Sequence, residues 1–169
     1  MLYLKGLRYT MKKIKFLISL KKEKKLGLIE PSNEMKNSYV LKSESNLISS
    51  KILFKNNQLE EAIALTYYSM YHMLTALLFK IGIKCENHGA SILLLKELFD
   101  IDNFDISSAK KERIDKQYYV NFHVIKQEVV NGIKNAEVFN SKLFDFISRI
   151  SNKDVDLYRE KFKGFFRKY

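Results

Sequence analysis

The chain has 169 residues, a length that suits one domain, and 46% of them are apolar, with 12 Phe and 10 Tyr. This composition excludes global disorder, and one Pro with six Gly is too few for the turns of an all-β protein. The formal net charge of +11 indicates either an anionic partner or a solvated lysine-rich surface. The lone Cys85 excludes an intramolecular disulfide and favours a reducing, cytoplasmic compartment.

Residues 1–30 are expected to form a basic N-terminal extension, in which residues 12–26 have the spacing of a short amphipathic helix. The start of this segment imitates a signal peptide, but its apolar part, Phe16 to Leu20, is short. Lysines follow at once, where a cleavage site should be. We therefore expect a soluble protein without a targeting segment or a membrane partner. Binding of the basic helix to an anionic membrane is a third, weaker alternative.

A helix is predicted from the start signal Pro31-Ser32-Asn33 to about Asn56. Leu41, Ile48 and Ile52 repeat on one of its faces. Val40 and Leu47 lie beside them, and the opposite face carries Lys42, Glu44 and Lys51.

The next helix is nearly all apolar and is predicted to begin with Asn57 as N-cap and Glu60 at N3, and to end near Gly82. It is long enough to span a membrane, but a helix with polar rings favours the centre of a bundle. The polar stripe comprises Tyr67, Tyr68, Tyr71, His72 and Thr75. A buried hydroxyl or imidazole without a partner costs roughly 1–3 kcal/mol, so this stripe needs partners. It marks the face where any chemistry would lie.

The remaining elements are helical. A shorter helix is predicted over residues 89–99, a loop over 101–107, and a helix from Ser108. A long amphipathic helix covers 125–150, and a basic aromatic helix covers 154–168. Long helices with short connections predict an all-α, up-and-down antiparallel bundle of four to five core helices in residues 31–150. The N-terminal basic helix and a C-terminal helix at 151–169 flank it.

Cys85 and His88 have the spacing of half a metal site, but a structural zinc needs four ligands close together. His72 and His123 are the only other histidines and no second Cys exists, so we expect no metal and no cofactor. His88 directly precedes a helix and is predicted to cap it or to pack at the end of the bundle.

The segment Glu112 to Tyr119 places an arginine close to two more tyrosines. Arg113 is followed by Tyr118 after four residues and by Tyr119 after five. In one interpretation these groups share a site with the central polar stripe. In the other, Arg113 pairs with a neighbouring carboxylate on the surface and the tyrosines belong to the core.

Together these segments resemble the HEPN superfamily, in particular its branch of small archaeal and bacterial proteins. The likeness covers Ser43 to about Ile147 and is carried by residues 56–95 and by KERIDKQYYV, residues 111–120. Within them the recurrent pattern is met by Tyr67, Tyr68, Tyr71, His72, Leu77, Leu78, Gly82, Ile83, His88 and Gly89.

The resemblance implies a helical bundle that forms a homodimer, with functional residues near the dimer cleft. Many HEPN proteins are metal-independent ribonucleases in which an Arg, followed after four to six residues by a His, steadies the phosphate while the His moves the 2′-hydroxyl proton. Several are toxins that act with a minimal nucleotidyltransferase partner, which in one system attaches AMP to a Tyr near this motif.

This chain departs from that motif, because Tyr118 or Tyr119 occupies the place of the His and His123 comes only after nine residues. The catalytic candidates are Arg113, Tyr118, His123 and His72. The binding candidates are Tyr67, Tyr68, Tyr71, Tyr119 and His88. We expect an RNA-targeting or toxin-like protein, with or without ribonuclease activity. The alternative is a non-catalytic module that binds RNA, a nucleotide or a protein partner.

Overall fold

The computed structural model describes the backbone of residues 2–118 and 123–167, and the side chains of residues 12–115 and 123–167. Nine elements follow one another in this part of the chain: α1 (Leu2–Lys22), β1 (Leu26–Leu28), α2 (Asn33–Lys55), α3 (Leu59–Ile81), β2 (Ile83–Cys85), α4 (His88–Glu97), α5 (Phe104–Tyr118), α6 (Lys126–Arg149) and α7 (Asn152–Arg167). The predicted all-α bundle is confirmed.

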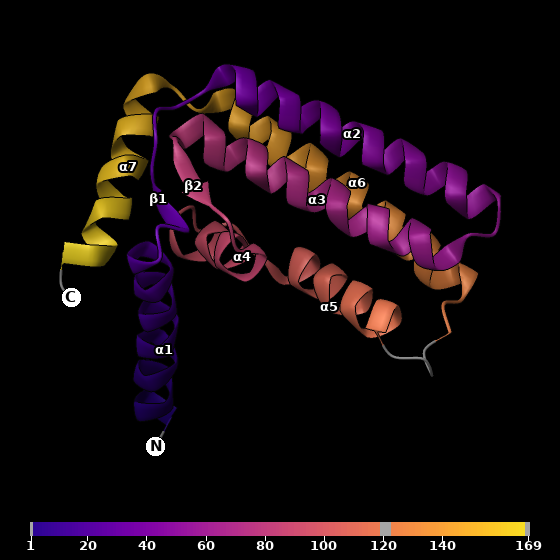
Figure 1. Ribbon diagram of the computed structural model, residues 1–169, viewed down its shortest axis with the longest axis horizontal. Coiled ribbons are helices and arrows are strands. Elements are labelled where there is room, and N and C mark those ends of the chain that lie inside the picture. The colour runs from indigo at the N-terminus through magenta and orange to yellow at the C-terminus, as the bar shows by residue number, and fades with distance from the viewer. Residues whose placement is uncertain (1, 119–122, 168–169) are drawn as a thin grey trace.

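Helix α3 is the centre of the bundle, with α2, α5 and α6 lying along it (Figure 1). Its side chains are buried on most sides, as the nearly all-apolar sequence predicts. Within the described residues it is the one helix long and apolar enough to cross a membrane, and most of that stretch is buried inside the protein. This is the placement of a core helix.

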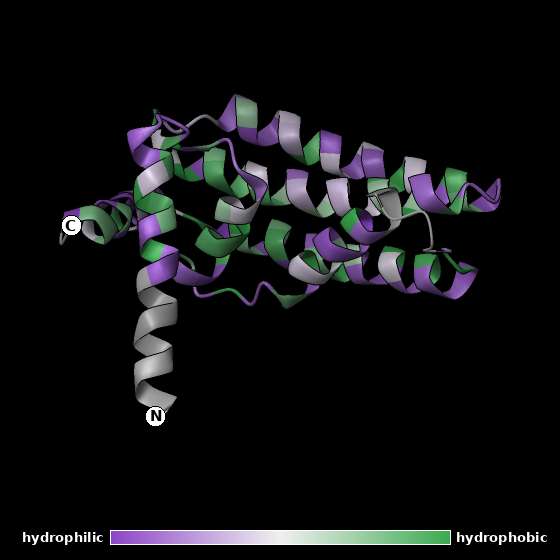
Figure 2. Cartoon of the chain, turned by 60° about the horizontal axis from the view of Figure 1, so that its bottom comes forward, coloured by the Kyte–Doolittle hydropathy of each residue, from purple (hydrophilic) through white to green (hydrophobic). Residues whose placement is uncertain are grey.

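Helix α2 packs closely against α3 through small polar residues rather than through its apolar row. Ser43 and Ser50 are fully buried, whereas Leu41, Ile48 and Ile52 are 65%, 59% and 54% exposed. Figure 2 shows hydrophilic and hydrophobic residues mixed along α2. The face on which Leu41, Ile48 and Ile52 repeat is therefore the exposed side of α2. A close contact between two helices requires small side chains, and the hydroxyls of Ser43 and Ser50 donate hydrogen bonds to backbone carbonyls of α3.

Polar side chains between α2, α3 and α6 form a hydrogen-bond network. Ser43 Oγ donates to the Ser69 carbonyl and Ser69 Oγ donates to the Ser43 carbonyl, each at 2.8 Å. From α6, Asn140 Nδ2 donates to Ser69 Oγ at 2.7 Å. Because a buried hydroxyl is costly only when it lacks a partner, these bonds allow three helices to meet at polar residues.

The turn between α2 and α3 differs from the prediction at the helix start. Gln58, not Asn57, is the N-cap of α3, and no side chain caps it. Asn57 has a positive φ of 59°, a left-handed conformation that Asn tolerates, and so it turns the chain instead of capping the helix. The predicted stop at Gly82 is confirmed, with φ of 78° at the C-cap.

A two-stranded antiparallel ribbon, absent from the prediction, ties the N-terminal segment to the bundle. Leu26 pairs with Cys85 and Leu28 with Ile83. Three-residue strands carry too little periodicity to be read from sequence, and their pairing is a long-range contact. The helix predicted over 12–26 begins at Leu2 and ends at Lys22.

Helix α5 begins at Phe104, inside the segment 101–107 that was expected to be a loop, so that boundary is wrong. The early start matters for the site, because α5 passes along α3 and brings its basic residues to the tyrosine stripe. The helices predicted over 125–150 and 154–168 are found as α6 and α7.

Candidate functional site: an arginine on a tyrosine and histidine cluster

The tyrosine stripe of α3 meets the first turn of α4. Tyr67 and Tyr71 are four residues apart, so their rings lie on one helix face, with centroids 6.1 Å apart. His88, the first residue of α4, stacks on Tyr71 with a centroid distance of 3.7 Å. Asn87 caps α4 by accepting a hydrogen bond from the Ala90 amide at 3.0 Å, which holds the imidazole over the stripe.

The Tyr67 hydroxyl and His88 Nδ1 are 2.7 Å apart and share a hydrogen bond. Tyr67 is fully buried, and His88 is its hydroxyl's partner among the described residues. With the phenol as donor, the neutral imidazole carries its hydrogen on Nε2. This bond fixes the orientation of the ring.

Arg113 reaches the same tyrosines from α5. Its Nη1 atom donates to the Tyr68 hydroxyl at 2.8 Å. The guanidinium carbon lies 5.4 Å from the Tyr67 ring centroid and 5.1 Å from that of Tyr68, within the range of cation–π attraction. Arg113 Nε is buried and has no hydrogen-bond partner among the described residues. The guanidinium is thus held by ring faces and one hydroxyl, and no described carboxylate pairs with it.

Burial and positive charge keep His88 neutral. Desolvation first, and then the charges of Arg113 and Lys110, lower the pKa of His88 to about 4. Desolvation likewise lowers the pKa of His72 and raises those of Tyr67 and Tyr71. At neutral pH the cluster therefore consists of uncharged rings beside a permanently charged guanidinium.

These shifts predict an acid-sensitive fold. An unfolded histidine binds its proton near pH 6.5, whereas His88 in the folded chain does so only near pH 4, so the unfolded state binds more protons in between. The contribution of neutral His88 to the free energy of unfolding should be fully present above about pH 6.5 and should be lost as the pH falls towards 4. Urea unfolding at several pH values measures this slope, which should be shallower in His88→Gln.

The matched control for the pH slope is His123→Gln, because His123 is exposed. An unchanged slope in His88→Gln, or an equal change in both variants, would contradict this account of His88.

The structure brings together five of the nine predicted site residues: Arg113, Tyr67, Tyr68, Tyr71 and His88. His72 lies at the edge of the stripe and pairs elsewhere, because its Nδ1 is 2.9 Å from Asn46 Nδ2 on α2. His123 is exposed and has no described contact with Arg113. The Tyr118 side chain and the whole of Tyr119 lie outside the described residues.

The sequence analysis did not single out Lys110, and it named His88 as a binding candidate without relating it to Arg113, although the charges of both cations act on this imidazole. Lys110 precedes Arg113 by three residues, one helical turn, and this spacing was the signal that could have found it. His88 reaches the tyrosines from α4 and Arg113 reaches them from α5, and no local spacing encodes that they meet there.

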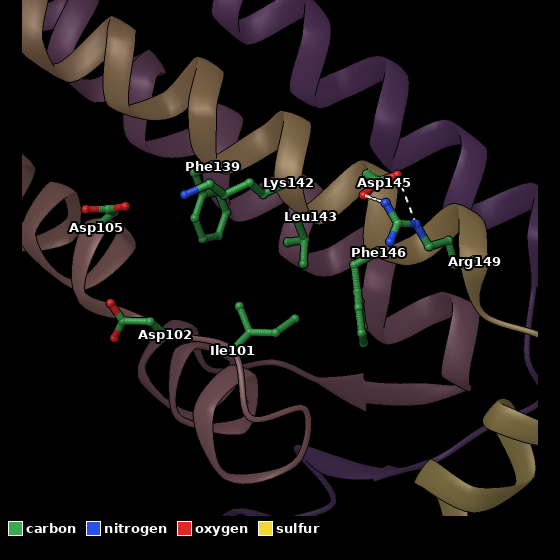
Figure 3. Close-up of a pocket in the computed structure, with 9 residues that line it drawn as sticks. All are labelled: Ile101, Asp102, Asp105, Phe139, Lys142, Leu143, Asp145, Phe146 and Arg149. Atoms are coloured by element: carbon green, nitrogen blue, oxygen red, sulfur yellow. Dashed lines mark hydrogen bonds and ion pairs between the residues drawn. The ribbon is translucent and has the colours of Figure 1, made fainter.

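The largest of the described hollows lies away from the tyrosines, His88 and Arg113. It has a volume of about 410 Å³ and an apolar floor of Ile101, Phe139, Leu143 and Phe146, and its rim is charged (Figure 3). Arg149 on this rim is already paired with Asp145. None of the predicted site residues lines it. In the described residues no group of three or more His, Cys, Asp or Glu could hold a metal ion.

The fold and cluster define a class: an all-helical bundle whose central helix presents aromatic side chains to a histidine and an arginine from neighbouring helices. The chain belongs to the HEPN domain family, whose model matches residues 36–144. This confirms the resemblance seen in the sequence. A comparison with curated proteins finds no match.

Proposed function

We propose that this HEPN-family protein is an RNA-targeting component that binds RNA phosphates at Arg113. The observation that carries the proposal is the arrangement of the guanidinium. It is held against two tyrosine rings and has no described carboxylate partner. Arginine offers several donors in a planar fork that matches a phosphate group. The chain's net charge of +11 favours association with a polyanion.

Replacement of Arg113 by alanine should weaken RNA binding by about tenfold to a hundredfold, because a charged hydrogen bond contributes roughly 1.5–3 kcal/mol. Fluorescence anisotropy with a labelled single-stranded RNA at fixed salt measures this change. Arg113→Lys, which keeps the charge but loses the planar fork, should fall between alanine and wild type.

Arg149→Ala is the matched control, since Arg149 is an exposed arginine of α6 paired with Asp145. It should bind RNA as the wild type does. Equal losses in both variants would mean that RNA responds to overall charge and not to this site. No loss in Arg113→Ala would reject the proposal, provided that circular dichroism shows both variants folded.

A second candidate function is metal-independent RNA cleavage, which the neutral His88 beside Arg113 favours. In the tautomer whose Nδ1–H donates to the Tyr67 hydroxyl, His88 would take the 2′-hydroxyl proton on its free Nε2 while Arg113 steadies the phosphate. A pKa of about 4 makes His88 a weak base at pH 7, so binding is the better-supported function. Incubation of RNA with excess protein and a chelator tests cleavage. His88→Ala, His72→Ala and His123→Ala then distinguish the proton carriers.

We infer two protein partners from the family. A minimal nucleotidyltransferase would modify Tyr118 or Tyr119, and mass spectrometry after co-expression would detect the added AMP.

A homodimer would use the exposed apolar row of Leu41, Ile48 and Ile52 on α2, and sedimentation equilibrium distinguishes it from a monomer. We place the protein in the cytoplasm, as a reduced Cys85 favours.

A further inference from the structure

Beside the arginine cluster lies a second hollow of about 360 Å³, where α1, α4 and α5 meet. Three lysines, Lys13, Lys96 and Lys110, line it together with Asn103, Ser107 and Gly89. None of the described side chains that line it is acidic. A hollow of this composition attracts an anion and repels a cation.

The three lysines differ in how their charge is compensated. Lys13 pairs with Glu97 and Lys96 pairs with Asp100, each at 2.8 Å. Lys110 has no carboxylate partner among the described residues. One ammonium group in this hollow is therefore left without a counter-charge.

Lys110 is also held where positive charge is already concentrated. A Cβ atom added to Gly89 would lie 3.4 Å from Lys110 Nζ, so the ammonium group sits over the first turn of α4. The amides of the first turn form the positive end of a helix dipole. Arg113 follows one turn later on α5, and both cations act on His88. Repulsion between these positive charges destabilises the folded state, and a bound anion would offset it.

We propose that this hollow binds a phosphate group, with Lys110 as its direct cationic ligand and with Ser107, Asn103 and the Gly89 backbone as neutral contacts. Because Lys110 and Arg113 are one turn apart on the same helix, the ligand meets both with neighbouring phosphates. The choice of RNA as the source of that phosphate rests on the function proposed above. The phosphate site itself does not, since a nucleotide offers the same group.

Calorimetric titration of the full chain with pyrophosphate tests the site without RNA. Lys110→Ala should weaken binding by about tenfold or more, because a charge-assisted hydrogen bond is lost. Lys111→Ala is the control, as the next residue is an exposed lysine of the same helix. It should leave pyrophosphate binding unchanged. Bound anion should also raise the pKa of His88 from about 4 towards its ordinary value in an NMR titration.

Absence of saturable pyrophosphate binding, or equal losses in Lys110→Ala and Lys111→Ala, overturns the proposal. A second arm compares RNA and ATP. If Lys110→Ala weakens RNA binding and lowers its salt slope by about one, RNA is the source. If pyrophosphate and ATP bind through Lys110 but no RNA binds, the phosphate site stands and the RNA-binding function fails. If RNA binding needs Arg113 while pyrophosphate does not bind through Lys110, the function stands and this site is overturned.

Discussion

Gly82→Ala should destabilise the protein by roughly 2–5 kcal/mol, the largest effect that we expect from one added methyl group. Gly82 has φ of 78°, where an L side chain costs about 1–2 kcal/mol. Its Cβ would also approach the Ile29 carbonyl to 2.5 Å and the Pro31 nitrogen to 2.8 Å, and it would clash with Arg159. Overpacking of this kind costs about 1–3 kcal/mol more.

The clash is expensive because these neighbours are themselves fixed. Ile29 donates its amide to the Gly82 carbonyl at 2.9 Å. Arg159 from α7 donates to the carbonyls of Ile29, Ile81 and Gly82 at 2.7, 3.1 and 3.2 Å. One guanidinium thus joins α7, the end of α3 and the chain after β1. A shift that makes room for the methyl group must break several of these bonds.

Gly164→Ala, the same substitution within α7, is the control for Gly82→Ala. A Cβ atom there meets nothing within 4 Å, and alanine is the better helix former. This variant should gain about 0.5–1 kcal/mol. Urea unfolding of both variants at pH 7 measures the contrast. A Gly82→Ala variant within about 1 kcal/mol of wild type would show that the segment around Ile29 and Pro31 yields more easily than its bonds suggest.

Ser69→Val should also cost roughly 2–5 kcal/mol. The substitution removes the acceptor of the Asn140 amide and the donor to the Ser43 carbonyl, in a place that is fully buried. An unsatisfied buried group costs about 1–3 kcal/mol. One methyl group of valine replaces the hydroxyl and the second is added, and overpacking of α2 against α3 costs about 1–3 kcal/mol more. Asn140 Oδ1 already lacks a hydrogen-bond partner among the described residues, so the Asn140 amide cannot make up for the loss of its bond to Ser69 with one that Oδ1 already makes.

Ser45→Val, an equivalent change on the exposed side of α2, separates packing from helix propensity. It should change stability by a few tenths of a kcal/mol, as expected for a β-branched residue in a helix. Calorimetric melting temperatures of the two variants make the comparison. Similar losses in both would show that the serine network contributes little.

The central helix and the helical class were predictable because their signals are local. The apolar run of α3, the start at Ser32 and the stop at Gly82 each depend on residues close together in the chain. The side of α2 that packs on α3 could not be read from its apolar row, because Leu41, Ile48 and Ile52 have ordinary core spacing and are nevertheless exposed. Its true contact is made by serines whose partners are more than ten residues away.

The residues of the candidate site were likewise predictable only where their signal is local in the sequence. The stripe of Tyr67, Tyr68 and Tyr71 could be read from helical spacing, and Arg113 from the family pattern. The histidine that joins them could not be chosen by distance in sequence. His88 lies 25 residues before Arg113 and His123 lies ten after it, yet His88 is the one that α4 places on the tyrosine rings.

Periodicity and motif spacing are short-range properties, and they were enough to predict a helical HEPN protein with a polar aromatic stripe on its central helix. Which residues meet that stripe could be seen only in the folded chain. The docking of α4 and α5 on α3 brings His88 and Arg113 to the tyrosines, and those contacts depend on how helices distant in the chain pack together.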